Sequence, residues 1–106
     1  QRPGVSALSR YRRAAKIDSN QPGIVEALRA IPGVTVNLGH DDIIVGYRGQ
    51  TYWYEIKEPG AVSKKTGEIR ESEKKQSQKD LEAKWKGHYK IIWSIDQILA
   101  EIMGGK

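Results

Sequence analysis

Two acids and one lysine stand in neighbouring apolar runs of this 106-residue chain. Asp42 opens the run 42–47, and Glu55 and Lys57 close the run Tyr-Trp-Tyr-Glu-Ile-Lys. Side chains alternate between the faces of a strand, so Glu55 and Lys57 are expected on one side and Ile56 on the other. Carboxylate oxygens suit Mg²⁺ and Mn²⁺, and an ammonium group beside them can position water or stabilise charge on a phosphate. The pattern predicts a metal-dependent nuclease centre.

The same residues allow a plainer interpretation. A Glu-x-Lys pair on a strand face is common and can be a solvated ion pair that contributes about 0–1 kcal/mol. The context favours the nuclease centre, because the residues 47–50, Tyr-Arg-Gly-Gln, are typical of a hairpin turn between the strand of Asp42 and the strand of Glu55.

The elements that position these residues follow from periodicity and from turn residues. Residues 18–20 offer N-cap candidates for a helix over 22–31, whose apolar side chains form one stripe. Residues 34–38 alternate as an outer strand should, and residues 89–93 give a further strand. Ser94 can cap a last helix over 94–102. We expect an α/β fold in a single domain over residues 1–106.

The composition changes abruptly between Glu58 and Lys79, where Pro, Gly, Ser, Lys and Glu dominate and Val62 and Ile69 are the main apolar side chains. This composition predicts a mobile loop that leads into a helix. Its lysines follow directly after the Glu-Ile-Lys strand, so we expect them beside the catalytic end, although the acids of the segment also allow a merely solvated loop.

The helix after this loop carries a glutamine at the top of an apolar stripe. Gln78, Leu81 and Trp85 are separated by three and four residues and therefore share one helix face. Gln78 could touch the lysine, the attacking water or the phosphate, or it could be a half-buried residue that bonds to backbone. Gln76 is the alternative on a different face.

Charge points to a polyanionic partner. The chain has 18 basic and 13 acidic residues, a net charge of +5, which favours phosphate contacts, although a merely basic domain is the alternative. Residues 1–17 are expected to be a basic arm or helix that could grip DNA or a second subunit, or a frayed terminus. The candidate DNA-binding residues are Arg10, Arg12, Arg13, Lys64, Lys65, Lys74, Lys75 and Lys79.

Several function classes are excluded by composition. The chain has no cysteine, so neither disulfides nor a cysteine-based zinc site is possible. Glycine-rich nucleotide loops are missing, and no apolar run approaches the roughly 20 residues that cross a bilayer. We therefore expect a cytoplasmic protein with no nucleotide cofactor and no membrane role.

The remaining histidines and aromatic residues have structural interpretations. His40, in a turn beside two acids, is expected to be a solvated neighbour rather than a general base, and His88 a structural or exposed residue. Trp53 and Trp93 lie within apolar strands and are expected in the core. The residues beside Trp53, Tyr52 and Tyr54, then project on the opposite face with no obligate role.

The stretch from Asp18 to Ile98 resembles the small phage and bacterial nucleases of the PD-(D/E)XK superfamily, especially the VRR-NUC type. The resemblance rests on the order and spacing of five motifs. They are the helix motif Asn-Gln-Pro-Gly-Ile-Val-Glu-Ala-Leu-Arg (20–29), then Asp-Ile-Ile-Val-Gly-Tyr-Arg-Gly (42–49), then Glu-Ile-Lys (55–57), a glutamine-bearing helix, and Trp-Lys-Gly-His-Tyr (85–89).

The resemblance implies a restriction-endonuclease-like core of helix, three-stranded hairpin sheet, helix and fourth strand, followed here by a C-terminal helix. It implies that Asp42 and Glu55 bind Mg²⁺ or Mn²⁺ with the backbone carbonyl of Ile56, and that Lys57 and Gln78 complete a site for phosphodiester hydrolysis. Two departures concern the ligands. Asp41 replaces the proline that usually precedes the aspartate, and the first helix offers Gln21 or Glu26 where relatives often have an acid.

The resemblance also implies a partner and a setting. Branched DNA, such as flaps or four-way junctions, is the expected substrate by analogy. Symmetrical cutting of two strands would require a homodimer with two centres. A phage or prophage protein that acts in the bacterial cytoplasm fits this resemblance. The alternative is a module that binds nucleic acid and keeps the fold without catalysis.

Overall fold

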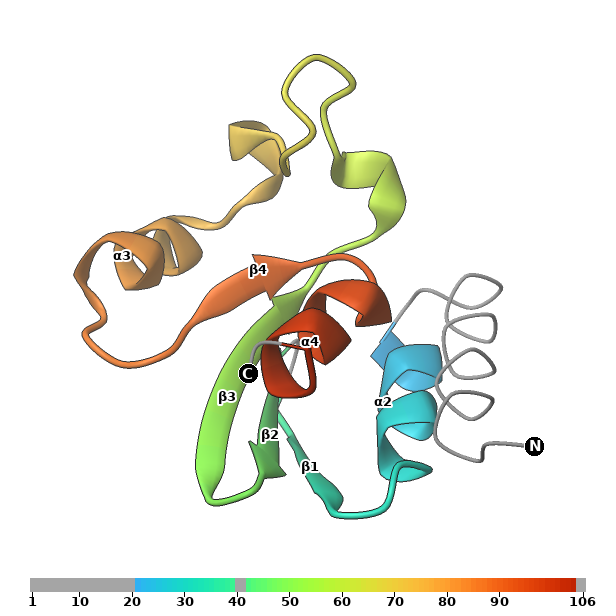
Figure 1. Cartoon of the computed structure of the whole chain (residues 1–106). Helices are drawn as coiled ribbons and strands as arrows, with labels where there is room; N and C mark the ends of the chain where they lie inside the picture. The colour runs from blue at the N-terminus through green and yellow to red at the C-terminus, as the bar shows by residue number, and fades with distance from the viewer. Residues whose placement is uncertain (1–20, 40–41, 105–106) are drawn as a thin grey trace.

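The computed structural model describes residues 21–39 and 42–104. It has a mixed α/β fold with one four-stranded sheet in the order β1-β2-β3-β4 (Figure 1). Strand β2 pairs antiparallel with both β1 and β3, whereas β4 is parallel to β3. The order of helices and strands is the expected one. The elements are α2 (Gln21–Arg29), β1 (Val34–Leu38), β2 (Asp42–Tyr47), β3 (Gln50–Ile56), the 3-10 turns η1 (Pro59–Ala61) and η2 (Glu71–Glu73), α3 (Gln76–Lys84), β4 (Lys90–Ile92) and α4 (Ile95–Ile102).

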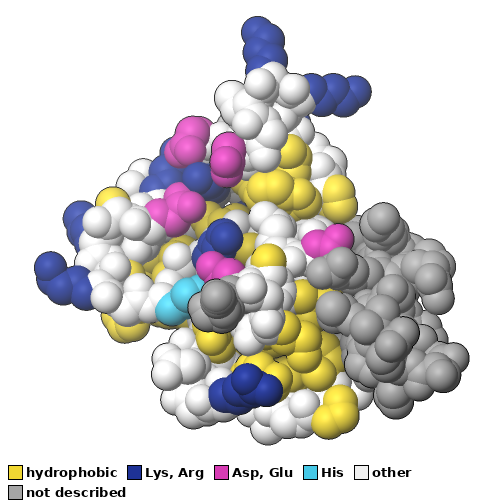
Figure 2. Space-filling view, in the orientation of Figure 1, with side chains coloured by type: hydrophobic (Ala, Val, Ile, Leu, Met, Phe, Trp, Pro, Cys, Tyr) yellow, Lys and Arg dark blue, Asp and Glu magenta, His cyan; other side chains and the backbone are white. Residues whose placement is uncertain are grey.

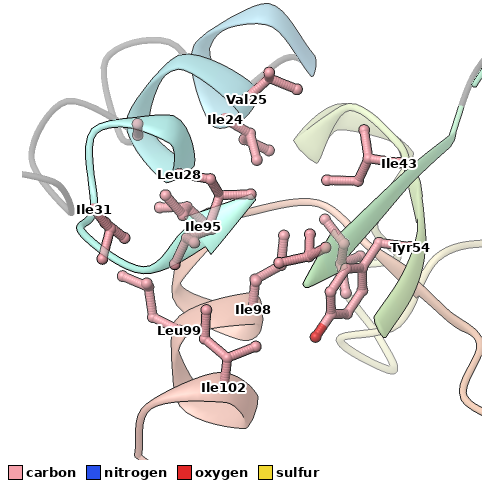
Figure 3. Close-up of a cluster of buried hydrophobic side chains, with 14 residues drawn as sticks. Ile24, Val25, Leu28, Ile31, Ile43, Tyr54, Ile95, Ile98, Leu99 and Ile102 are labelled. Atoms are coloured by element: carbon pink, nitrogen blue, oxygen red, sulfur yellow. The ribbon is translucent and has the colours of Figure 1, made fainter. Parts of the chain in front are cut away.

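The main core lies between one face of the sheet and the helices α2 and α4 (Figure 3). Strand alternation brings Ile43, Val45 and Tyr54 to this face, and all three are fully buried. Burial of each such side chain contributes about 1.5–3 kcal/mol. The helices contribute apolar side chains spaced by three and four residues, which are Ile24, Val25, Leu28, Ile95, Ile98, Leu99 and Ile102. This face of the sheet therefore serves stability and leaves the other face for a site.

The hairpin between β2 and β3 is closed by the two residues Arg48 and Gly49, as the sequence predicts. Both have positive φ, 52° and 79°, which is the conformation of a type I′ turn. Such a turn matches the twist of the strands and fixes their register. The register places Asp42 at the start of β2 directly opposite Glu55 near the end of β3.

The expected placement of the aromatic residues of β3 is wrong. Tyr54 lies in the main core, while Trp53 is half-buried on the opposite face. Alternation defines two faces but does not say which one the helices cover. The partner strand decides this, because Tyr54 is opposite the fully buried Ile43. Tyr52, on the face of Tyr54, is partly buried against the same core.

The segment between β3 and α3 is folded, where a plain loop was expected. Its two main apolar residues, Val62 and Ile69, pair in an antiparallel bridge. Arg70 donates hydrogen bonds to the carbonyls of Gly60, at 3.0 Å, and Val62, at 3.3 Å. A second apolar cluster joins this segment to β4 and its flanking residues, and it comprises Ala61, Ile69 and Ile91 with Val62, Tyr89 and Trp93 packed against them.

Glu101 of α4 fastens the last helix to the sheet. It accepts hydrogen bonds from the Tyr54 hydroxyl at 2.5 Å and from His88 Nε2 at 2.9 Å, and Lys90 lies 3.4 Å away. Burial alone would raise the pKa of Glu101, but these partners outweigh it and lower the pKa. The other ring nitrogen of His88 accepts the backbone N–H of Trp53 at 3.0 Å, so His88 has the expected structural role.

The helix α4 begins where the sequence predicts. The side-chain oxygen of Gln97 accepts the backbone N–H groups of Trp93, at 2.7 Å, and Ser94, at 3.0 Å, which satisfies donors at the helix start. Within the described ranges, no helix combines the length and the apolar composition that a membrane crossing requires.

Candidate functional site

Asp42 and Glu55 form a pair of acids across the hairpin. Directly opposite residues of antiparallel strands have their Cβ atoms about 4.5–5.5 Å apart and share one face of the sheet. This is the face that α2 and α4 leave uncovered. Glu55 is only 6% exposed although it carries a carboxyl group. Two carboxylates that face each other across a hairpin offer hard oxygen ligands, so the acid pair is suited to hold a divalent cation.

The carboxylate of Asp42 is held in place from two sides. Its Oδ2 accepts a hydrogen bond from the indole N–H of Trp53 at 2.7 Å. On the other side lies Gly39, whose N–H donates to the Asp42 carbonyl at 2.8 Å. A Cβ atom at Gly39 would overlap the Asp42 carboxylate and lie 2.9 Å from its Cγ. The glycine therefore lets the backbone approach the acid closely, and Trp53 fixes one of its oxygens.

Lys57 extends the line of β3 beyond the strand end. Its backbone N–H donates to the carbonyl of Ile92 at 2.8 Å, which continues the pairing with β4. Lys57 and Glu55 both line a pocket of about 530 Å³, together with Ile56. The remaining residues that line this pocket are Gln21, Pro22, Glu58, Gly60, Ala61, Arg70 and Glu73. Asp42 is not among them and meets Glu55 from the neighbouring strand.

The pocket separates the two ligand candidates of the first helix. Gln21, at the start of α2, lines the pocket beside Glu55. Glu26 lies one turn farther along, is exposed, and lines a second groove with Arg29 and Leu38, which Gln21 also lines. Of these two candidates, Gln21 is the one that shares the pocket of Glu55, and it offers a neutral amide oxygen.

The side chain of Gln78 bonds to backbone, which is the second of the two alternatives that the sequence left open. It is the buried residue of α3, 5% exposed, and its side-chain oxygen accepts the backbone N–H of Lys75 at 2.9 Å. It satisfies a donor at the start of the helix in this way. Gln78 is not among the residues that line the pocket of Glu55 and Lys57.

Tyr89 is a site residue that sequence reasoning missed. Its hydroxyl is buried and has no hydrogen-bond partner among the residues that the structure describes. Burial raises the pKa of Tyr89, and the negative charges of Glu55, Glu82 and Asp42 raise it further. Side-chain alternation along β4 could have revealed the placement of Tyr89. Ile91 is opposite Glu55, and Tyr89, two residues before Ile91, lies on the same face of the sheet.

The basic candidates differ in exposure and in their partners. Lys64 and Lys65 are exposed on the turn between the bridge residues, from which basic side chains project at the top of Figure 2. Lys74 is held between Glu71 at 3.1 Å and Glu82 at 2.9 Å. Burial would lower the pKa of Lys74, but these acids outweigh it and raise the pKa.

Lys75 is exposed, and Lys79 is half-buried on α3. The remaining candidates, Arg10, Arg12 and Arg13, lie outside the described residues, as do His40 and Asp41.

The donor set of the acid pair suits a hard cation. Among residues 21–39 and 42–104, no group of three or more acid, histidine or cysteine side chains could hold a metal ion. Mg²⁺ is commonly bound through one or two carboxylates, with water and substrate phosphate as the other ligands. Asp42 and Glu55 match that requirement, and Tyr89, whose hydroxyl has no hydrogen-bond partner among the described residues, lies on the same face of the sheet.

Comparison of the chain with protein-family models, with curated proteins and with solved structures finds no match in any of the three. The resemblance of its motifs to the PD-(D/E)XK nucleases therefore stays a hypothesis.

Proposed function

We propose that this protein is a Mg²⁺- or Mn²⁺-dependent endodeoxyribonuclease that hydrolyses phosphodiester bonds. One observation carries the proposal: the hairpin register sets Asp42 opposite Glu55, and Lys57 follows Glu55 in the same pocket. Two hard oxygen ligands and an adjacent amine suit metal-assisted phosphoryl transfer.

Each residue has a role in this proposal. A bound divalent ion would lower the pKa of water and neutralise charge on the phosphate. Asp42 and Glu55 hold that ion, with the Ile56 carbonyl and the Gln21 amide as further oxygen donors. Lys57 orients the attacking water or stabilises charge on the phosphate oxygens. The Tyr89 hydroxyl donates a hydrogen bond to an oxygen held at the acid pair.

The arrangement of the chain supports the same proposal. A helix, three antiparallel strands, a helix and a parallel fourth strand occur in the order that a restriction-endonuclease-like core requires. By the same resemblance we propose branched DNA as the substrate, a homodimer as the form that cuts two strands, and the bacterial cytoplasm during phage infection as the setting. Lys64 and Lys65 are then the exposed contacts for the phosphate backbone.

The second candidate is a module that binds nucleic acid without cutting it. Two observations favour it. Among the described residues, no third acid, histidine or cysteine joins Asp42 and Glu55 to form a metal-binding group, and α2 contributes the neutral Gln21 to the pocket. Such a module would keep the basic surface and bind DNA whether or not a metal is present.

Cation binding and cleavage can be measured separately. Mn²⁺ binding would be measured by calorimetry in the absence of DNA. We expect it to be lost in Asp42→Asn and Glu55→Gln and retained in Lys57→Met. Lys57→Met should still lose cleavage by about 10²–10³-fold, because one charge-stabilising group is gone. Glu68→Gln, on an exposed turn, is the matched control. Wild-type cleavage by Lys57→Met, or unchanged Mn²⁺ binding in Glu55→Gln, would refute these roles.

A further inference from the structure

We propose that Trp85 is a stacking platform for an unpaired nucleobase of the DNA substrate. The inference rests on the proposed function for the identity of its partner. Trp85 follows the last residue of α3, and its side chain is one of the two large apolar side chains that are exposed in the described ranges, at 51%. The other, Leu38, lies on β1.

The indole ring of Trp85 is held in place although it is exposed. Its centroid lies 5.3 Å from that of Trp53, and the two rings meet edge to face at 86°. Gly87 lies against it from another side, since a Cβ atom at Gly87 would come within 2.9 Å of Trp85 Nε1. A fixed aromatic ring loses little conformational freedom when a base stacks on it, and such stacking is independent of base identity.

A shallow groove of about 470 Å³ lies beside the ring. Leu81 is an apolar part of its lining, and Ser77 adds a hydroxyl group. Asp80 also lines the groove, and its carboxylate accepts a hydrogen bond from Gln76 at 3.0 Å. The groove is of the size that accommodates small-molecule ligands. It therefore has room for one base beside the indole.

The charges around the ring suit a phosphate backbone. Lys84 and Lys86 flank Trp85 directly, and both are exposed. No acid occurs between Glu82 and Asp96. Basic side chains project at the left edge of Figure 2, over α3 and the turn after it. An aromatic ring between lysines is the combination that binds single-stranded nucleic acid, with the base on the ring and the phosphates on the amines.

The ring is also connected to the acid pair. Trp85 contacts Trp53, and the indole N–H of Trp53 binds the Asp42 carboxylate. A single indole therefore separates the platform from the site of hydrolysis. Bases inside a duplex are stacked on one another and offer no open face, so the platform selects strands with unpaired bases. Flaps and junction arms provide such bases next to a duplex.

Binding in EDTA tests the platform without cleavage. Fluorescence anisotropy of labelled DNA would compare a 5′ flap, single-stranded oligothymidine and a blunt duplex of equal length. We expect Trp85→Leu, which keeps an apolar side chain, to weaken binding of the flap and the single strand by about 5- to 150-fold. Binding of the blunt duplex should change less than about twofold, and Trp85→Phe should restore much of the lost affinity.

Three results would overturn the platform. They are equal losses for all three DNAs, unchanged binding of the flap by Trp85→Leu, and a switch of Trp85→Leu from dimer to monomer in light scattering, which would make the ring an interface between copies. Circular dichroism melting checks that both variants fold. Binding of the flap that depends on Trp85, without any cleavage in Mg²⁺, would refute the nuclease and leave the platform standing.

Discussion

Asp42 and Glu55 are directly opposite each other at the open end of the β2–β3 hairpin, on the face that the main core leaves free. Their alignment is set at the other end of the hairpin by the turn at Arg48 and Gly49. A slip of one residue would move one acid to the opposite face. Local turn geometry therefore determines whether the two carboxylates meet.

Substitution of Gly39 by alanine tests the position of Asp42. The new methyl group would overlap the Asp42 carboxylate and push it away from Trp53. We expect a loss of cleavage on the order of 100-fold, because misplacement of a catalytic group by about 1 Å has that cost. The thermal midpoint should fall as well, because the methyl group would also lie 3.3 Å from the backbone carbonyl oxygen of Asp42. Asn37→Ala, exposed on β1, is the control. Wild-type cleavage by Gly39→Ala would show that the close approach is irrelevant.

Tyr89→Phe should shift stability and activity in opposite directions. The hydroxyl is buried without a partner among the described residues, and an unsatisfied buried polar group costs about 1–3 kcal/mol. Its removal should raise the free energy of unfolding by on the order of 1 kcal/mol in urea titrations. Cleavage should fall, because the variant loses the proposed hydrogen bond from the hydroxyl to an oxygen held at the acid pair. A variant that is both less stable and fully active would contradict this role.

Glu101 makes stability depend on pH. Its pKa is lower in the folded protein than its usual value near 4.5, so it stabilises the fold above that value and the contribution is lost as pH falls further. At neutral pH, Glu101→Gln should lower the free energy of unfolding by on the order of 2 kcal/mol. The difference from wild type should shrink as the pH falls below 4.5 and the carboxyl group of Glu101 becomes protonated. A gap that is constant between these pH values, measured beside Glu68→Gln, would exclude the linkage.

The sequence predicts local structure and the acid pair but not which face is the core. The turn after Tyr47, the strand alternation and the cap at Ser94 are local signals, and the structure has each of these elements. Tyr89 was missed, because its approach to the acids depends on β4 being parallel to β3, a pairing that joins residues far apart in the chain. The sequence did not decide whether Gln78 contacts the site or caps the helix by bonding to backbone, because a glutamine at that position suits either role.

Trp53 is a second residue whose surroundings the sequence did not predict. Its place within an apolar strand predicted the core, yet its indole N–H binds the Asp42 carboxylate and its ring contacts Trp85. A half-buried tryptophan with a polar partner cannot be distinguished from a core tryptophan by strand alternation alone.

Metal-dependent cleavage is the most direct test of the acid pair. The purified protein would be incubated with labelled linear, flap and four-way-junction DNA in Mg²⁺, Mn²⁺ or EDTA, beside Glu55→Gln and Glu68→Gln. The account predicts cleavage in either metal, none in EDTA, none by Glu55→Gln, and unchanged cleavage by Glu68→Gln. Cleavage that persists in EDTA or in Glu55→Gln, or DNA binding without cleavage in any of these substrates, would contradict it.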